Sequence, residues 1–274
     1  MRRTASLRED CEAIVRAAIR RVQPDAAVRR ALEGKDFGGG RLITVAVGKA
    51  AWSMAKAASE QLGDRIDGGI VITKYGHARG PIPPLAIREA GHPVPDRNSF
   101  EATAEALRMT ASLRAEDTVL FLLSGGGSAL FEQPLVDPEE LRDVNRQLLA
   151  SGADIAEINT VRKRFSAVKA GRFAEHCAPA HLFSIVLSDV LGDPLDVIAS
   201  GPACADSSSS DDALAVAAGY ALRLSPQAMD SLRRETPKRL DNVETQITGS
   251  VRELCAAAAE ACRELGYADR KSVV

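Results

Sequence analysis

The stretch Thr118–Leu130 reads TVLFLLSGGGSAL, a run of apolar residues that passes directly into three glycines. The apolar part, residues 118–123, is typical of a strand that is buried on both faces of a parallel sheet. Three successive glycines are entropically costly, and they are expected where backbone N–H groups approach an anionic ligand. A flexible linker is a poor alternative directly after a buried strand. The sequence therefore predicts an anion-binding loop, with candidate residues Ser124, Gly125, Gly126, Gly127 and Ser128.

Buried strands alternate with helices along the whole chain. This alternation predicts an α/β fold, a parallel-sheet Rossmann-like layered domain with helices on both faces. Strands are predicted over residues 42–47, 69–73, 85–89, 118–123 and 182–187. Helices are predicted over two segments within 5–34, and over 50–62, 100–113, 138–150, 155–174, 212–222, 226–235 and 251–265. Because ligands bind beyond the carboxyl ends of the strands in such sheets, we expect the chemistry at those ends.

The composition excludes several classes of protein. Among 274 residues, 35 Lys+Arg stand against 37 Asp+Glu, so no net basic field exists to hold nucleic acid or an anionic membrane. Aromatic residues make up only 4%, too few for base-stacking platforms, and no apolar run is long enough to span a bilayer. Five cysteines without a CxxC pair favour reduced thiols over disulfides or zinc. With no secretory signal, the expected location is the cytoplasm.

A glycine and a lysine, Gly48 and Lys49, follow the first predicted strand. The glycine permits a tight turn, and the N–H groups of the next helix together with the Lys49 cation suit a phosphate or carboxylate. The alternative is an ordinary strand-to-helix turn with a solvated lysine. Because a cation in the first helical turn opposes the helix dipole, we favour the functional interpretation. The segment is not a Walker A loop, because position 43 is Ile and position 50 is Ala.

Two other glycine-turn motifs do not fit the loop at 124–128. A serine-hydrolase elbow, G-x-S-x-G, and a dinucleotide fingerprint, G-x-G-x-x-G, both require glycine at position 130, which is Leu130.

A basic segment runs from Asn159 to Arg172. If the segment is helical, Arg162, Ser166 and Lys169 fall on one face, where Arg162 would grip a carboxylate and Lys169 would supply charge to a phosphate. The alternative, a solvated basic face, stays open on these residues alone.

Two aspartates follow the strand predicted at 182–187. Asp189 has the chemistry to deprotonate a hydroxyl, and Asp193 has the oxygen ligands that Mg²⁺ prefers. Loop capping by aspartate is an equally good interpretation. The one histidine in a rigid context, His92 among prolines, is at least as well explained by structure as by catalysis.

Five motifs occur in an order that resembles the class II glycerate 2-kinase family. The match covers about residues 10–265, and although no motif is decisive alone, five in order are specific. The motifs are VGKA at 47–50, GHPVPD at 91–96, LSGGGSAL at 123–130, NTVRK at 159–163, and SDVLGD at 188–193 with SGP at 200–202.

The resemblance implies transfer of the ATP γ-phosphate to the 2-hydroxyl of D-glycerate, giving 2-phosphoglycerate, with a divalent cation such as Mg²⁺. It makes Lys49 and Asp189 the catalytic candidates and Asp193 the metal ligand. Substrate or phosphate binding falls to Gly48, Ser124, Gly125, Gly126, Gly127, Ser128, Asn159, Arg162 and Lys169. The chain departs from the family pattern at Arg164, usually His, at Ala170, usually the first of a glycine pair, and at Ala203, usually Thr.

The expected partners are the small molecules D-glycerate and ATP, without nucleic acid or membrane, and with a homodimer left open. An NAD(P)H-dependent hydroxypyruvate reductase and a non-catalytic sugar-acid or phosphate-binding domain are the alternatives. Family members are longer than this chain and add a C-terminal MOFRL domain. We therefore expect residues 1–265 to form the N-terminal glycerate kinase domain, 266–274 to be a truncated end, and the chain alone to turn over little.

Overall fold

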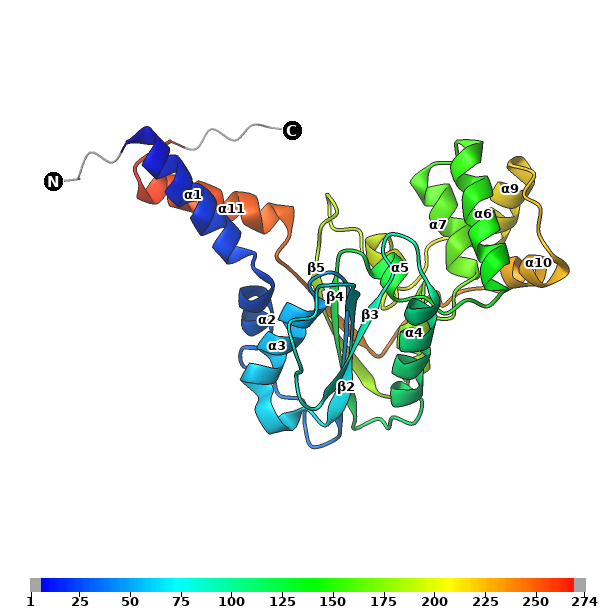
Figure 1. The fold of residues 1–274 in the computed structure, drawn as a ribbon, viewed down its shortest axis with the longest axis horizontal. Helices are drawn as coiled ribbons and strands as arrows, with labels where there is room; N and C mark the ends of the chain where they lie inside the picture. Colours follow the sequence, from blue (N-terminus) through cyan, green and yellow to red (C-terminus); the bar gives the residue numbers. More distant parts are fainter. Residues whose placement is uncertain (1–5, 269–274) are drawn as a thin grey trace.

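The central element is a six-stranded, all-parallel sheet (Figure 1). The computed structural model describes residues 6–268. The strand order is β3-β2-β1-β4-β5-β6, the order of doubly wound nucleotide-binding folds. The strands are β1 Leu42–Val47, β2 Gly68–Lys74, β3 Leu85–Ala90, β4 Thr118–Ser124, β5 His181–Leu187 and β6 Val243–Thr248.

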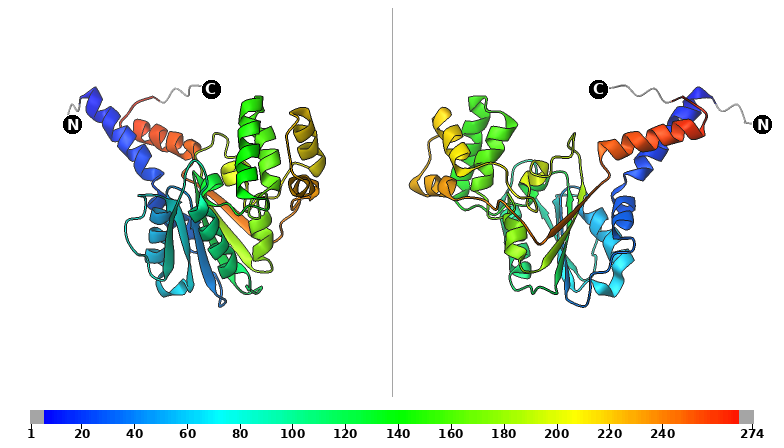
Figure 2. Two further views of the ribbon diagram at one scale, coloured as in Figure 1. Left: turned by 45° about the vertical axis from the view of Figure 1, so that its right-hand side comes forward. Right: turned by 180° about the vertical axis from the view of Figure 1, so that it is seen from behind.

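Helices cover both faces of this sheet (Figures 1 and 2). Side chains alternate along each strand, so Val45 packs with α4 and α8 on one face, whereas Ala46 packs with α2 and α3 on the other. Both clusters are buried and apolar, and the predicted layered α/β architecture is confirmed. The helices are α1 Leu7–Arg21, α2 Pro24–Leu32, α3 Ala51–Leu62, α4 Arg97–Thr110, α5 Gly127–Leu130, α6 Pro138–Ser151, α7 Ile155–Arg164, α8 Arg172–Cys177, α9 Ser210–Gly219, α10 Pro226–Arg233 and α11 Val251–Glu264, with short 3₁₀ turns at Gly63–Arg65 and Ile198–Ser200.

Two helical groups lie outside the sheet layers (Figure 1). Helices α1 and α11 lie side by side away from the sheet, and Tyr267 donates a hydrogen bond of 2.6 Å to Asp10 between them. Helices α6, α7, α9 and α10 form a lobe on the other side with an apolar cluster of their own. No helix among residues 6–268 is long and apolar enough to cross a membrane.

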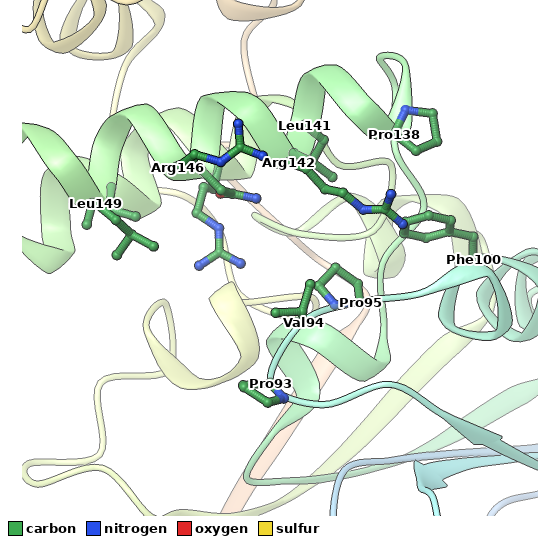
Figure 3. Close-up of a pocket in the computed structure, with 12 residues that line it drawn as sticks. Pro93, Val94, Pro95, Phe100, Pro138, Leu141, Arg142, Arg146 and Leu149 are labelled. Atoms are coloured by element: carbon green, nitrogen blue, oxygen red, sulfur yellow. The ribbon is translucent and has the colours of Figure 1, made fainter.

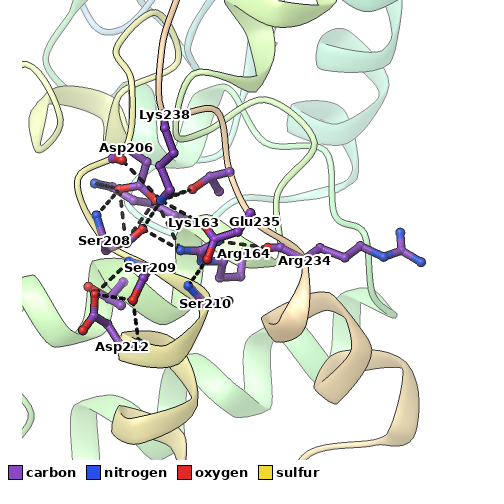
Figure 4. Close-up of polar contacts among 12 residues, drawn as sticks. Lys163, Arg164, Asp206, Ser208, Ser209, Ser210, Asp212, Arg234, Glu235 and Lys238 are labelled. Carbon is purple, nitrogen blue, oxygen red and sulfur yellow. Dashed lines mark hydrogen bonds and ion pairs between the residues drawn. The ribbon is translucent and has the colours of Figure 1, made fainter.

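A buried polar network ties α7 to the segments around Asp206 and Glu235 (Figure 4). Arg164 is fully buried, and its guanidinium donates to the backbone oxygens of Arg234 at 2.9 Å and Ser208 at 2.7 Å. Lys163 lies 3.3 Å from Asp206. At position 164, where the family pattern usually has His, the two terminal nitrogens of the arginine therefore have structural partners, whereas its Nε is buried without a hydrogen-bond acceptor among the described residues.

The structure corrects one predicted helix, adds a strand that was not predicted and leaves the domain division untested. The helix expected over 155–174 is two helices, because α7 ends at Arg164 and the backbone of Phe165 and Ala167 pairs with Leu135 and Gln133 instead of continuing the helix. Ala170 and Gly171, with left-handed φ values of +55° and +81°, lie just before α8 begins. The edge strand β6 was not predicted. The division into 1–265 and a truncated end stays a prediction, and its residues 269–274 lie outside the described part of the chain.

Candidate functional site

The candidate site lies at the carboxyl ends of β1, β4 and β5. The chain winds outward in opposite directions from β1 and β4, so the crevice beyond their ends is the switch point where doubly wound sheets bind ligands. Gly48 ends β1 with φ +118°, and a Cβ there would lie 2.4 Å from the backbone oxygen of Ser124. Only glycine permits the two strand ends to approach this closely.

Ser124 joins the two strand ends through its hydroxyl. Its Oγ accepts the N–H of Ala50 at 3.1 Å and donates to the carbonyl of Val47 at 3.3 Å, and the residue is 1% exposed. The N–H of Lys49 in turn donates to the carbonyl of Gly125 at 2.9 Å. Ser124 was predicted to bind substrate or phosphate, and in the structure its hydroxyl is instead hydrogen-bonded to the backbone of the two strand ends.

Lys49 and Asp189 face each other across the glycine turn. The Lys49 ammonium lies 3.8 Å from Asp189 Oδ2, and both side chains remain about half exposed. A Cβ on Gly125 would lie 2.0 Å from the same carboxylate oxygen. Asp189 therefore occupies the space that a side chain at position 125 would fill. The Lys49 ammonium, the Asp189 carboxylate and the Gly125 backbone lie close together here.

His92 completes this group from the loop after β3. Gly126 has φ +92°, and a Cβ there would lie 3.1 Å from His92 Nε2 and 3.3 Å from Lys49 Cγ. Burial and the neighbouring Lys49 hold the pKa of His92 below its usual value, against the attraction of Asp189. These surroundings favour the uncharged form of the imidazole. The sequence could not distinguish a place for His92 in the site from a purely structural place. His92 follows β3 and Gly126 follows β4, and the two residues come together only in the folded sheet.

The second half of the glycine loop begins helix α5. Gly127 is its first residue, and the first N–H groups of a helix have no partner within it. Ser128 Oγ lies 3.2 Å from Ser200 Oγ, and Ala199 and Ser200 both have left-handed φ values, +51° and +62°. Such strain in non-glycine residues concentrates at functional sites. The glycine loop and the strained turn at 199–200 thus lie against each other and form one wall of the candidate site.

Asp193 lies on the loop after β5, half buried, with φ +54°. Among residues 6–268, no group of three or more His, Cys, Asp or Glu side chains is placed to hold a metal ion. A single carboxylate such as that of Asp193 is a ligand that Mg²⁺ takes together with substrate phosphates and water.

The candidates from the basic segment separate in the structure. Asn159 and Arg162 lie one turn apart on α7, and neither side chain makes a hydrogen bond or ion pair with another residue that the structure describes. Lys169 lies beyond the end of that helix. It is fully buried and paired with Glu132, itself 2% exposed, so its expected role in phosphate binding is corrected to an internal ion pair.

Fold and site together define a doubly wound α/β domain whose switch point carries a lysine, a glycine turn, a carboxylate and a histidine. A family model described as "Domain of unknown function (DUF4147)" matches residues 10–233. The chain therefore belongs to this family.

The similar proteins that carry names are longer. The D-glycerate 2-kinase of Thermotoga maritima is 52% identical over 264 residues, which is 96% of this chain and 63% of the relative. A solved glycerate kinase structure from the same organism superposes with a TM-score of 0.91 at 51% identity, covering 95% of this chain and 63% of that one. A protein of Agrobacterium vitis named for hydroxypyruvate reductase is 39% identical over 95% of this chain and 60% of its own length. This chain thus spans about three fifths of these relatives.

Proposed function

We propose that the protein transfers the γ-phosphate of ATP to the 2-hydroxyl of D-glycerate, yielding 2-phosphoglycerate and ADP. The observation that carries this proposal is the meeting of Lys49, Asp189 and the Gly125–Gly126 backbone at the switch point. The name of the Thermotoga relative supports the same reaction. Phosphoryl transfer needs little covalent chemistry from the protein, so positioning and charge neutralisation are the main tasks.

Asp189 is placed to act on the acceptor hydroxyl. Its carboxylate accepts the proton as the 2-oxygen of glycerate attacks the γ-phosphorus, and the bond from that phosphorus to the bridging oxygen of ADP breaks. Lys49, 3.8 Å away, neutralises charge on the transferred phosphoryl group. The backbone at Gly125–Gly127 lets phosphate oxygens approach without obstruction by side chains. Asp193 would contribute one carboxylate to Mg²⁺, which neutralises phosphate charge when bound.

A hydroxypyruvate reductase is the first alternative, because the strand order is shared with dinucleotide-binding domains and one relative bears that name. The third glycine of the dinucleotide fingerprint permits close packing of helix on strand. Here Leu130 occupies that position, fully buried in the core. The second alternative, a domain that binds sugar acids without turnover, predicts calorimetric binding of D-glycerate with no ADP release.

ADP release, measured with D-glycerate and MgATP, tests the proposal. We expect Lys49→Ala to lower kcat/KM by about 10²-fold or more, as for loss of a group that stabilises transition-state charge. Lys56→Ala is the matched control, since Lys56 lies on the neighbouring helix α3 and pairs with Glu60 on the surface. Equal kcat/KM for Lys49→Ala and the control would remove Lys49 from the reaction. Oxidation of NADH by hydroxypyruvate without ADP release would replace the proposal by the reductase.

A further inference from the structure

A cavity of about 370 Å³ lies next to the switch point, between helix α6 and the loop after β3 (Figure 3). Its size falls within the usual range for small-molecule sites, roughly 300–1,000 Å³. Pro93, Val94 and Pro95 form one wall and face Leu141 and Leu149 of α6 across it. Phe100, Pro138, Arg142, Asn145, Arg146, Ile158 and Arg162 complete the lining.

The walls of the cavity are apolar and partly open to solvent. Val94 is 62% exposed and Leu149 is 73% exposed, unusual values for large apolar side chains that face each other across a cavity. An aromatic ring, Phe100, lies at one end. Such a slot suits a flat, largely apolar group, which would cover side chains that water now reaches.

The lining of the cavity also carries three arginines, Arg142, Arg146 and Arg162, and the charge of the last is not paired within the described part of the chain. Arg142 and Arg146 pair with acids of their own helix, Glu139 and Asp143. The Arg162 side chain makes no hydrogen bond or ion pair with any residue from 6 to 268. A guanidinium has five donors and stays charged, so leaving it unpaired in a partly buried place is costly unless an anion binds there.

The carboxylate of Glu132 does not neutralise Arg162, because it is already paired with another cation. Burial lowers the pKa of Arg162, and the nearby Glu132 carboxylate opposes this shift. Glu132 is already paired with the buried Lys169, so with both cations charged the three side chains retain one positive charge. In addition, Asn145 Oδ1 is buried in the cavity lining without a hydrogen-bond donor.

The cavity and the candidate site share one loop. His92 faces Gly126 and Lys49, and the next residue, Pro93, lines the cavity. A ligand with a flat apolar end and a chain of phosphates can therefore lie with the first in the cavity and the last at the glycine turn.

We propose that this cavity binds the purine nucleoside of the phosphoryl donor, with Arg162 holding its phosphate chain on the way to Lys49. The inference rests on the proposed kinase function and deepens it, because it separates the nucleotide from the sugar acid. Arg162 thereby serves the nucleotide rather than glycerate, and it is a binding residue, not a catalytic one.

Calorimetric titration of the purified protein with MgADP tests the cavity directly, and titration with D-glycerate serves as the second probe. We expect Arg162→Gln to weaken MgADP binding at least about tenfold, the effect of losing charge-assisted hydrogen bonds to phosphate. Val94→Trp, which fills the slot from an exposed position, should weaken MgADP binding to a similar extent. Neither change should alter D-glycerate binding more than about twofold. Arg233→Gln is the matched control, an exposed arginine of α10 paired with Asp230.

The outcomes separate this inference from the function on which it rests. Unchanged MgADP affinity in both variants, or no MgADP binding by the unaltered protein, would overturn the cavity assignment. Weakened MgADP binding in a protein that never releases ADP with D-glycerate would support the cavity and overturn the proposed reaction. In steady-state assays, Arg162→Gln should raise KM for ATP and leave KM for D-glycerate unchanged. A rise in KM for D-glycerate alone would assign Arg162 to the sugar acid and contradict the inference.

Discussion

Replacement of Gly125 by alanine separates the role of the site from the stability of the fold. A Cβ at this position would lie 2.0 Å from Asp189 Oδ2 and 2.7 Å from its carboxyl carbon, and the three nearest atoms all belong to that side chain. The Asp189 side chain is 57% exposed and ends a flexible group, so it can rotate away. Gly125→Ala therefore moves one carboxylate and leaves the strands in place.

Gly48→Ala should behave differently, because the new Cβ would meet backbone atoms that cannot move away. A Cβ there would lie 2.4 Å from the carbonyl oxygen of Ser124, and φ is +118°. Left-handed strain costs about 1–2 kcal/mol, and the two hydrogen bonds that join the strand ends contribute about 1 kcal/mol each. We therefore expect Gly48→Ala to lower the free energy of unfolding by about 3–4 kcal/mol. Gly125→Ala should change it by less than about 1 kcal/mol, since alanine also restricts the unfolded chain.

Urea unfolding measures the effect of each substitution on stability, and ADP release measures its effect on activity. Gly125→Ala should keep its unfolding midpoint and lose about 10²-fold or more in kcat/KM, the usual contribution of a positioned general base. Gly39→Ala is the control, because a Cβ there meets nothing within 4 Å. The reasoning is refuted if Gly125→Ala is as active as Gly39→Ala, or if it unfolds as readily as Gly48→Ala.

Three further predictions concern other parts of the molecule. Ala170→Gly should raise the free energy of unfolding by about 0.5–1 kcal/mol, because relief of left-handed strain at φ +55° exceeds the added freedom of the unfolded chain. Ala256→Gly in α11 is the control and should destabilise the protein in urea. Destabilisation by Ala170→Gly as well would contradict the prediction. Lys49→Met should raise the pKa of His92, since burial and then Lys49 lower it, and an NMR titration of the imidazole that shows no change would place Lys49 away from His92. Hydrogen bonds from the backbone of Arg114 and from Arg41 hold the pKa of Asp117 below its usual value of 3.8, so its stabilising contribution is present at pH 7 and is lost as the pH falls below about 4. The urea midpoint of Asp117→Asn should consequently fall less than that of the unaltered protein between pH 7 and about pH 2, and an equal fall would exclude this contribution.

The central strands could be predicted because strands buried on both faces form continuous apolar runs. The β6 segment, VETQIT, was missed because it is a half-exposed edge strand in which polar residues interrupt the run. The break in the helix predicted over 155–174 depends on backbone hydrogen bonds between the segment at 133–135 and the residues Phe165 and Ala167, which local sequence does not reveal. Local patterns thus predict buried elements better than edges and bends.

The site was predictable where its residues directly follow a strand. Lys49, the glycines and Asp189 do so, and parallel strands bring their ends together. Lys169 was assigned to phosphate because the local pattern cannot distinguish a solvated cation from one paired with Glu132, a residue 37 positions earlier in the chain. The cavity beside Arg162 joins α4, α6, α7 and a loop, which meet only through tertiary packing.

Phosphorus NMR of the products from D-glycerate and MgATP tests the central claim most directly. The account predicts that the purified protein forms 2-phosphoglycerate and ADP in equal amounts, and that Lys49→Ala loses this reaction while Lys56→Ala keeps it. Formation of a different phosphorylated product would contradict the assignment of the acceptor hydroxyl. Full product formation by Lys49→Ala would contradict the role of the switch point itself.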